Sequence, residues 1–320
     1  MFRHNRAKFL VLFALIAFVS APAYAQDYPS RPLIIVVPFG VGSGADIGAR
    51  QAAEKMRPSF KQLIVVMNRS GANGMNAASY VAKSTPDGYT IFYGSNSTMA
   101  AAPAFFKFVP YDPIKDFASV AIVNETAFLL LGQPGHTGTS VSAHMEKMRA
   151  DPDFSIGGIS TLYEMLDKMI RNATGAKHVY VPYNDQGKAF TDLIGKRITG
   201  VYASVSSAIP LIRSGQAHPI AVASTERLKS LPSVPTLMET YPDLALGVWN
   251  GFFAPAKTPQ RVLESLSPHI FTAYRDPDVV KRVEEGGRSL HMGPDEADKF
   301  LRSEFVRWSE LVRSLGIEPQ

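Results

Sequence analysis

The feature that most constrains the fold is an alternation of short apolar runs, glycine-containing loops and amphipathic segments. The run Leu33–Phe39 is rich in strand-forming residues, a loop follows from Gly40 to Gly44, and a helical pattern covers Asp46–Met56. The cycle repeats with a strand at 62–67, a helix at 75–83 and a strand at 90–93. Such alternation predicts a mainly parallel sheet with helices on both faces.

A second series of the same kind begins at the apolar run Ala127–Leu131. Its expected elements are helices at 141–150 and 163–173 and strands at 178–181, 198–203 and 219–223. After the proline-rich stretch Leu231–Pro235 come an apolar segment, Val248–Ala254, and three helical stretches that run to Leu315. Two blocks that meet near residue 125 and again near 225 predict two α/β lobes joined by two crossings of the chain, with a ligand cleft between them.

The first 25 residues have the order of a secretory signal peptide. Three basic residues within the first eight positions precede the apolar run Phe9–Val19 and then Ala23-Tyr24-Ala25. The apolar run has 11 residues, against the roughly 20 that a membrane-spanning helix needs. We therefore expect export with cleavage after Ala25, and not a retained membrane anchor.

Charge and cysteine content exclude several classes of protein. The chain has a formal net charge of +5, but its first 25 residues hold three basic residues and no acid, so residues 26–320 carry 30 Lys and Arg against 28 Asp and Glu. That balance, without a dense basic stretch, disfavours nucleic-acid binding. With no cysteine, the chain has no disulfide, no thiol nucleophile and no cysteine-linked lipid.

The sequence lacks the common catalytic and metal-binding motifs, and its seven histidines are scattered. We therefore expect no catalytic residue, no metal and no cofactor. One motif leaves an alternative open, because Gly42-Ser-Gly44 with Gly48 approaches a dinucleotide fingerprint. It is one residue too long, and Asp46 would repel a pyrophosphate. An exported NAD(P)-dependent oxidoreductase is thus the alternative from a different class.

Three loops rich in glycine and hydroxyl residues suit the binding of an anion. They are Gly40–Asp46, Gly94–Thr98 and Gly157–Thr161, and each follows an expected strand or precedes an expected helix. Backbone N–H groups and the helix dipole hold an anion at such places without a charged side chain. Ordinary helix capping and turn formation explain any single loop equally well.

Ordered motifs along the exported region carry a family resemblance. They are Tyr28-Pro-Ser-Arg-Pro32, Val37-Pro-Phe39 with Gly42 and Asp46, Asn68-Arg69-Ser-Gly71, Pro86-Asp-Gly-Tyr-Thr90, Pro110-Tyr-Asp-Pro113 with Lys115-Asp-Phe117, Val181-Pro-Tyr183, Thr191-Asp-Leu193, Pro232-Ser-Val-Pro-Thr236 and Phe253-Ala-Pro255. Through these motifs the chain resembles the substrate-binding proteins of tripartite tricarboxylate transporters, the Bug family.

The resemblance implies an α/β, type II periplasmic binding protein fold with a ligand cleft. Its lobe 1 would comprise residues 26–124 and 225–320, and its lobe 2 residues 125–224. It also implies a periplasmic protein, not an enzyme, that captures a small organic anion, typically a carboxylate, for membrane permease subunits. We expect the protein to be a monomer. Presentation of the ligand to a sensor is the alternative within the same class.

The resemblance also assigns ligand-binding positions. In lobe 1 they are Phe39, Gly42, Ser43 and Asp46, with Ser95, Asn96, Ser97 and Thr98. In lobe 2 they are Gly157, Gly158, Ser160, Thr161, Tyr183, Ala203 and Ser204.

Two departures from the family pattern bear on the ligand. Ile156 stands where the family usually has a serine, and Ala203 where it commonly has an aspartate. An isoleucine and an alanine in the pocket would leave polar groups of a ligand unsatisfied, which predicts a less polar distal part, such as that of an aromatic or branched acid.

Four residues allow two interpretations each. We expect Asp46 to shape its loop together with Ser43 and not to contact the ligand. Trp249 is expected in the core, whereas Phe39 suits the core and ligand stacking about equally. Lys188 could meet a second carboxylate, but a lone lysine is more often solvated.

Overall fold

The computed structural model describes residues 28–135, 140–242, 244 and 246–319. Residues 31–320 form one compact unit, to which the following description refers. The expected signal peptide, residues 1–25, lies outside the described residues. Within those residues, no helix combines the length and the apolar character needed to cross a membrane.

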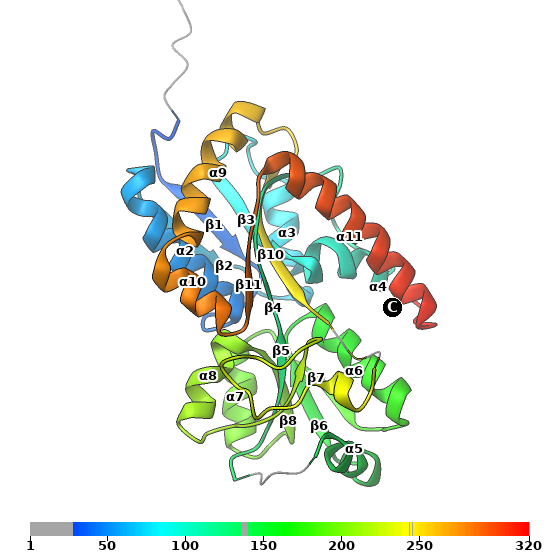
Figure 1. Cartoon of the computed structure of the whole chain (residues 1–320). Helices are drawn as coiled ribbons and strands as arrows, with labels where there is room; N and C mark the ends of the chain where they lie inside the picture. The colour runs from blue at the N-terminus through cyan, green and yellow to red at the C-terminus, as the bar shows by residue number, and fades with distance from the viewer. Residues whose placement is uncertain (1–27, 136–139, 243, 245, 320) are drawn as a thin grey trace, which may run out of the picture. The chain divides into compact units, whose positions relative to one another are not determined.

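The larger of two sheets has six strands in the order β11-β4-β10-β3-β1-β2 (Figure 1). Strand β1 pairs in parallel with β2 and β3, while β10 pairs antiparallel with β3 and β4, and β11 antiparallel with β4. The strands are β1 (Leu33–Val37), β2 (Ile64–Asn68), β3 (Thr90–Ser95), β4 (Phe117–Thr126), β10 (Val248–Pro255) and β11 (Gly287–Met292).

The smaller sheet has five strands in the order β7-β6-β8-β5-β9. Strand β6 is parallel to β7 and β8, whereas β5 is antiparallel to β8 and β9. The strands are β5 (Phe128–Gly132), β6 (Ser155–Gly158), β7 (Val179–Pro182), β8 (Gly200–Ser204) and β9 (His218–Ala223).

Both sheets are mixed, so the expectation of a mainly parallel sheet is wrong. The reason lies in the crossings of the chain. Strand β4 leaves the larger sheet and continues after Ala127 as β5 of the smaller one. After β9 the chain returns as β10, which inserts between β3 and β4 in the opposite direction to both. Alternation along the sequence does not reveal this reversal.

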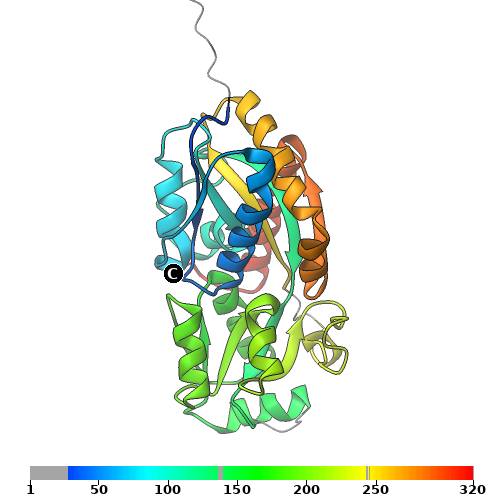
Figure 2. The same ribbon diagram turned by 90° about the vertical axis from the view of Figure 1, so that its left-hand side faces the viewer.

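Helices cover both faces of the larger sheet, with α2, α9 and α10 on one face and α3, α4 and α11 on the other (Figures 1 and 2). The helices are α2 (Gly44–Phe60), α3 (Met75–Ala82), α4 (Ala102–Phe105), α5 (Val141–Ala150), α6 (Thr161–Thr174), α7 (Gln186–Ile194), α8 (Val205–Arg213), α9 (Gln260–Tyr274), α10 (Pro277–Glu284) and α11 (Pro294–Ser314). Short helical turns are η1 (Ala72–Gly74), η2 (Ser97–Ala101) and η3 (Leu237–Glu239).

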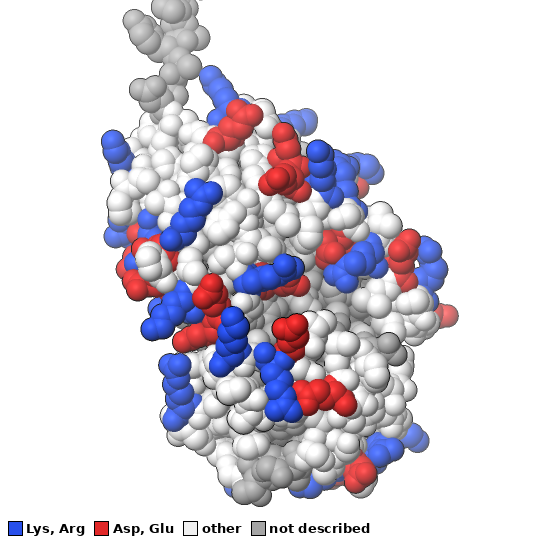
Figure 3. Space-filling model, in the orientation of Figure 1, with Lys and Arg blue, Asp and Glu red and all other residues white. Residues whose placement is uncertain are grey.

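Basic and acidic side chains are interspersed on the face of the molecule that Figure 3 shows. This agrees with the near balance of charge expected for residues 26–320. A continuous basic surface of the kind that binds nucleic acid is not seen on this face.

Trp249 on β10 lies in the core, as expected, with 3% of its surface exposed. Its Nε1 donates to Glu304 Oε2 over 2.7 Å, and Trp308 Nε1 donates to the same oxygen over 3.1 Å. Burial opposes ionisation of Glu304, but hydrogen bonds from Arg307 and the two indoles outweigh it and lower the pKa of this carboxyl. Glu304 therefore fixes α11 to the larger sheet as a carboxylate.

Replacing Glu304 by glutamine is expected to lower the free energy of unfolding by about 1–3 kcal/mol at neutral pH, because the buried carboxylate loses its charge-assisted hydrogen bonds from Arg307, Trp249 and Trp308. Since the pKa of Glu304 is lowered on folding, its contribution is present above the ordinary value of 4.5 and is lost as pH falls through the folded value. Urea unfolding measured at several pH values should show that the difference in the free energy of unfolding between Glu304→Gln and wild type becomes smaller as the pH is lowered from 7 to 3. Glu310→Gln, an exposed change on the same helix, should have no such effect.

Candidate functional site

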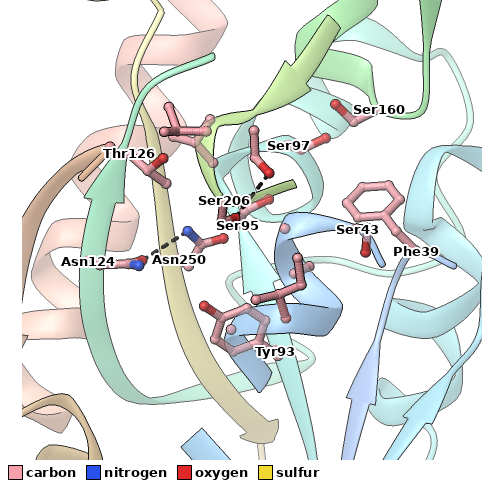
Figure 4. Close-up of a pocket in the computed structure, with 18 of the residues that line it drawn as sticks. Phe39, Ser43, Tyr93, Ser95, Ser97, Asn124, Thr126, Ser160, Ser206 and Asn250 are labelled. Carbon is pink, nitrogen blue, oxygen red and sulfur yellow. Dashed lines mark hydrogen bonds between the residues drawn. The ribbon is translucent and has the colours of Figure 1, made fainter. Parts of the chain in front are cut away.

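A pocket lies between the lobe built on the larger sheet and the lobe built on the smaller sheet (Figure 4). It is found where β1, β3, β6 and β8 end, which is where an open α/β sheet places its loops. The larger-sheet lobe contributes Phe39, Ser43, Ile47, Tyr93, Ser95, Ser97, Asn124, Thr126, Val248, Asn250, Tyr274 and Arg282, and the smaller-sheet lobe contributes Phe128, Ser160, Leu162, Tyr163, Ser204, Val205 and Ser206.

Three helices begin at this pocket, each with a serine as its N-cap. Ser43 Oγ accepts from the Asp46 N–H at the start of α2 (3.2 Å), Ser160 Oγ from the Tyr163 N–H of α6 (3.4 Å), and Ser204 Oγ from the Ser207 N–H of α8 (3.4 Å). All three serines line the pocket. The positive ends of three helix dipoles thus meet there, which favours a negatively charged ligand.

Ser97 adds a hydroxyl that has no partner within the protein. Only 2% of this residue is exposed, and its Oγ lacks a hydrogen bond to any of the described residues. A buried hydroxyl without a partner is unfavourable. Because Ser97 lines the same pocket as Ser43 and Ser160 (Figure 4), an oxygen of a bound ligand would supply the missing bond.

Neutral polar pairs form another part of the wall. Asn250 Nδ2 donates to Asn124 Oδ1 over 2.9 Å, and the hydroxyls of Tyr93 and Tyr274 are 3.0 Å apart. Burial raises the pKa of Tyr93 to about 12 and that of Tyr274 well above its ordinary value, so both hydroxyls keep their protons at neutral pH. The tyrosine pair uses one of its two protons in its mutual bond, which leaves the other for a ligand.

Six of the residues expected to bind ligand line the pocket: Phe39, Ser43, Ser95, Ser97, Ser160 and Ser204. The other nine, which do not line it, are Gly42, Asp46, Asn96, Thr98, Gly157, Gly158, Thr161, Tyr183 and Ala203. Several of these have structural partners instead. Asn96 Nδ2 donates to the Gly247 carbonyl over 2.8 Å, and Tyr183 Oη donates to Asp192 Oδ2 over 2.8 Å.

Asp46 shapes the loop before α2, as expected. Its carboxylate accepts from the Gly42 N–H (3.0 Å), Arg50 Nε (2.9 Å) and Asn68 Nδ2 (2.9 Å). Its own N–H donates to Ser43 Oγ, so the two residues form half of a capping box, and the second bond goes to Gly42. Gly42 has a φ of +80°, a conformation that glycine adopts without strain. These bonds place Ser43 at the pocket.

The expectation of a ligand with a less polar distal part assumed that Ile156 and Ala203 lie in the pocket, and the structure does not place them there. Both side chains are fully buried, and neither lines the pocket. They belong to the hydrophobic clusters on either side of the smaller sheet. Lys188 is exposed and does not line the pocket either.

Sequence reasoning missed most of the strand residues of the site, and it missed Arg282. Tyr93, Asn124 and Asn250 come together because β10 pairs with both β3 and β4: Asn250 lies opposite Ser95 on one side and opposite Asn124 on the other. The one available signal was Asn250, a polar residue inside the apolar run Val248–Ala254. No group of three or more histidine, aspartate or glutamate side chains in the described part of the chain is arranged to hold a metal ion.

Comparison with known proteins decides the family. The model of the TctC family, described as the tripartite tricarboxylate transporter family receptor, matches residues 48–317. The chain belongs to this family. The resemblance inferred from the sequence motifs is thereby confirmed. Because TctC proteins are binding proteins and not enzymes, the alternative of an oxidoreductase is discarded.

Solved structures of TctC relatives confirm the two-lobed fold. The periplasmic binding protein BugD has a TM-score of 0.86 at 28% identity, covering 92% of this chain and 100% of its own. Rpa4515 from R. palustris with adipate has a TM-score of 0.84 at 28% identity, covering 92% and 100%. MatC from Rhodopseudomonas palustris with bound malate has a TM-score of 0.82 at 28% identity, covering 89% and 100%. The chain is thus a periplasmic solute-binding protein of the TctC family.

Proposed function

We propose that this TctC protein captures a small organic carboxylate between its lobes and delivers it to the membrane subunits of a tripartite transporter. The observation that carries the proposal is the convergence of three helix N-termini, at Ser43, Ser160 and Ser204, beside the unpartnered hydroxyl of Ser97. Among the described residues, no Asp or Glu lines the pocket. A carboxylate would accept hydrogen bonds from the N–H groups at the helix N-termini and from the Ser97 hydroxyl, without lying next to another negative charge.

The relatives support a carboxylate in particular. Adipate is the ligand of Rpa4515, and malate is the ligand of MatC. Both relatives share the two-lobed architecture over nine-tenths or so of this chain. Within the pocket, apolar side chains such as Phe128, Val205 and Val248 leave room for a hydrocarbon part.

Capture is proposed to occur by closure of lobe 1, residues 26–124 and 225–320, on lobe 2, residues 125–224. The hinges would lie at the two crossings, around Ala127 and in the segment between β9 and β10. The protein is proposed to act as a monomer in the periplasm after cleavage behind Ala25. Presentation of the same ligand to a sensor would use the same site.

Calorimetry and thermal unfolding of the protein purified from a periplasmic extract test the proposal. A ligand that binds only the folded state at 100 times its Kd should stabilise that state by about 2.7 kcal/mol. We expect this response from one or more aliphatic or aromatic carboxylates, and none from nucleotides. A response to nucleotides alone would overturn the proposal, and the intact mass of the exported protein checks cleavage behind Ala25.

A further inference from the structure

A second hollow lies on the lobe built on the larger sheet, alongside α3 (Figure 1), and we call it the α3 groove. Its walls are residues 68–70 at the end of β2, one face of α3 with residues 83–85 that follow it, and Thr90 and Pro110. It shares no lining residue with the ligand pocket. The α3 groove is therefore a separate surface, to which the capture of a carboxylate gives no role.

The α3 groove is polar and carries positive charge. Arg69 and Lys83 line it, and among the described residues no Asp or Glu does. Neither cation forms an ion pair with another described residue. The Arg69 guanidinium lies 4.1 Å from the centroid of the Tyr80 ring. Stacking of this kind uses the face of the guanidinium and leaves the N–H groups at its edge for a carboxylate.

Acids close to the α3 groove already have basic partners. Asp87 and Asp112 are the acids nearest in sequence to the lining residues. Asp87 pairs with Arg31, and Asp112 pairs with Lys115 (3.0 Å). A negatively charged segment of another protein would thus meet two cations and no carboxylate in the lining.

The shape of the α3 groove suits a segment of polypeptide better than a small molecule. Small-molecule pockets enclose their ligand and are mostly apolar. Here both cations are exposed, as are Ser70, Asn76 and Thr85. From Asn76 to Lys83 the α3 groove follows about two turns of helix, a length of about 11 Å. An extended segment of three or four residues covers that length at about 3.3 Å per residue.

Three of the motifs that carry the family resemblance meet at the α3 groove. Asn68-Arg69-Ser-Gly71 supplies one end, Thr90 is the last residue of Pro86-Asp-Gly-Tyr-Thr90, and Pro110 is the first of Pro110-Tyr-Asp-Pro113. None of these residues lines the ligand pocket. A surface built from family motifs suits a partner that receptors of the family have in common, and for a TctC receptor this is the membrane part of its transporter.

Asn68 joins the α3 groove to the ligand pocket. This residue lines the groove, and its Nδ2 donates to the Phe39 carbonyl (2.8 Å) and to Asp46 Oδ1 (2.9 Å). Phe39 and Ser43 line the ligand pocket from the same loop. A partner in the α3 groove would therefore lie beside the loop that has to release the ligand.

We propose that the α3 groove is the docking site for an acidic, extended segment of a membrane subunit of the transporter. The inference rests on the proposed delivery of the ligand to such subunits and deepens it, since it predicts where the receptor is bound and by what chemistry. Arg69 and Lys83 would pair with carboxylates of that segment, while hydroxyls and amides along α3 bind its backbone.

Photocrosslinking in living cells of the bacterium that carries this protein tests the inference. The probe is a benzophenone amino acid placed at position 85 of the full chain, because Thr85 is exposed and lines the α3 groove. Mass spectrometry identifies the crosslinked protein, which is expected to be a membrane subunit of the transporter. Arg69→Glu together with Lys83→Glu should lower the crosslink yield about tenfold or more, because like charges would then meet.

Lys257→Glu together with Arg261→Glu is the matched control. Both residues are exposed on the same lobe, line neither hollow, and change the net charge by the same amount. This control should crosslink like wild type, and both double variants should keep the wild-type melting temperature and affinity for a carboxylate. Arg69→Gln together with Lys83→Gln, a milder change at the same positions, should give an intermediate crosslink yield.

Several results would overturn the inference while the carboxylate function stands. They are a wild-type receptor that crosslinks no membrane subunit from position 85, and equal losses of crosslink in the groove variant and the control. Vesicles of anionic phospholipid test a lipid partner: if only proteins with an intact groove sediment with them and no membrane subunit is crosslinked, the groove binds the membrane surface instead. If calorimetry detects no carboxylate binding by wild type, the proposed function falls and the inference with it.

Discussion

Replacing Gly44 by alanine is expected to weaken ligand binding by about 30- to 100-fold. A Cβ at position 44 would lie 2.3 Å from Ser204 Oγ and 2.7 Å from Ser204 Cβ, closer than real Cβ contacts come. Ser204 cannot turn away easily, because its hydroxyl caps α8 and contacts the hydroxyls of Ser206 and Ser207. The starts of α2 and α8 would have to separate. Since these helices belong to different lobes, the closed arrangement would become rare, and apparent affinity falls by the fraction that remains closed.

Calorimetry with a bound carboxylate measures the loss of affinity, and small-angle scattering measures the compaction that the ligand induces. Gly293→Ala is the control, because Gly293 has a φ of −72° and its added Cβ would meet nothing within 4 Å. Both variants should unfold like wild type without ligand, as an open arrangement does not need the contact between Gly44 and Ser204. An alanine variant at position 44 that binds and compacts like wild type would show that closure does not bring these helices together.

The fold class was predictable because its signal is local. The helix expected at 141–150 coincides with α5, Val141–Ala150, and the strand expected at 219–223 differs from β9 by one residue. Strands β4 and β11 escaped notice for a physical reason. The end of β4 carries Asn124, Glu125 and Thr126, which interrupt its apolar run, and β11 is an edge strand whose residues are at most half-buried. The apolar run left in β4, Val120–Val123, is only four residues long, and β11 lacks the pattern of a buried strand altogether.

The pocket residues at the starts of helices could be predicted from the sequence, whereas those brought together by strand pairing could not. Ser43, Ser160 and Ser204 stand at positions that a sequence pattern can assign, since a serine before a helix is a common N-cap. The meeting of Ser95, Asn250 and Asn124 depends on the pairing of strands far apart in the sequence.

One wrong expectation and one omission come from information that the sequence does not contain: the face of a strand that a side chain occupies, and the neighbours of a helix. Successive side chains of a strand point to opposite faces, so a position known only by its family match, such as Ile156 or Ala203, does not reveal which face it occupies. A lone arginine in a helix, such as Arg282, looks like any solvated cation until the helix is placed beside a pocket.

Ser97→Ala is expected to lower affinity for a carboxylate by about 10- to 100-fold, as a hydrogen bond to a charged group contributes about 1.5–3 kcal/mol. Without ligand, the stability of the variant should equal or slightly exceed that of wild type, because the buried Ser97 Oγ has no partner in the described protein. Loss of affinity without loss of stability is the signature of a hydroxyl that serves the ligand. A merely structural serine would show the reverse.

Ser119→Ala provides the matched control for calorimetry and urea unfolding. Ser119 on β4 is also buried, with 4% exposed, and its Oγ also has no partner among the described residues, but it does not line the pocket. The same chemical change there should leave affinity untouched. If the two variants bind a carboxylate equally well, Ser97 does not contact the ligand, and the carboxylate must be held by the three helix N-termini without it.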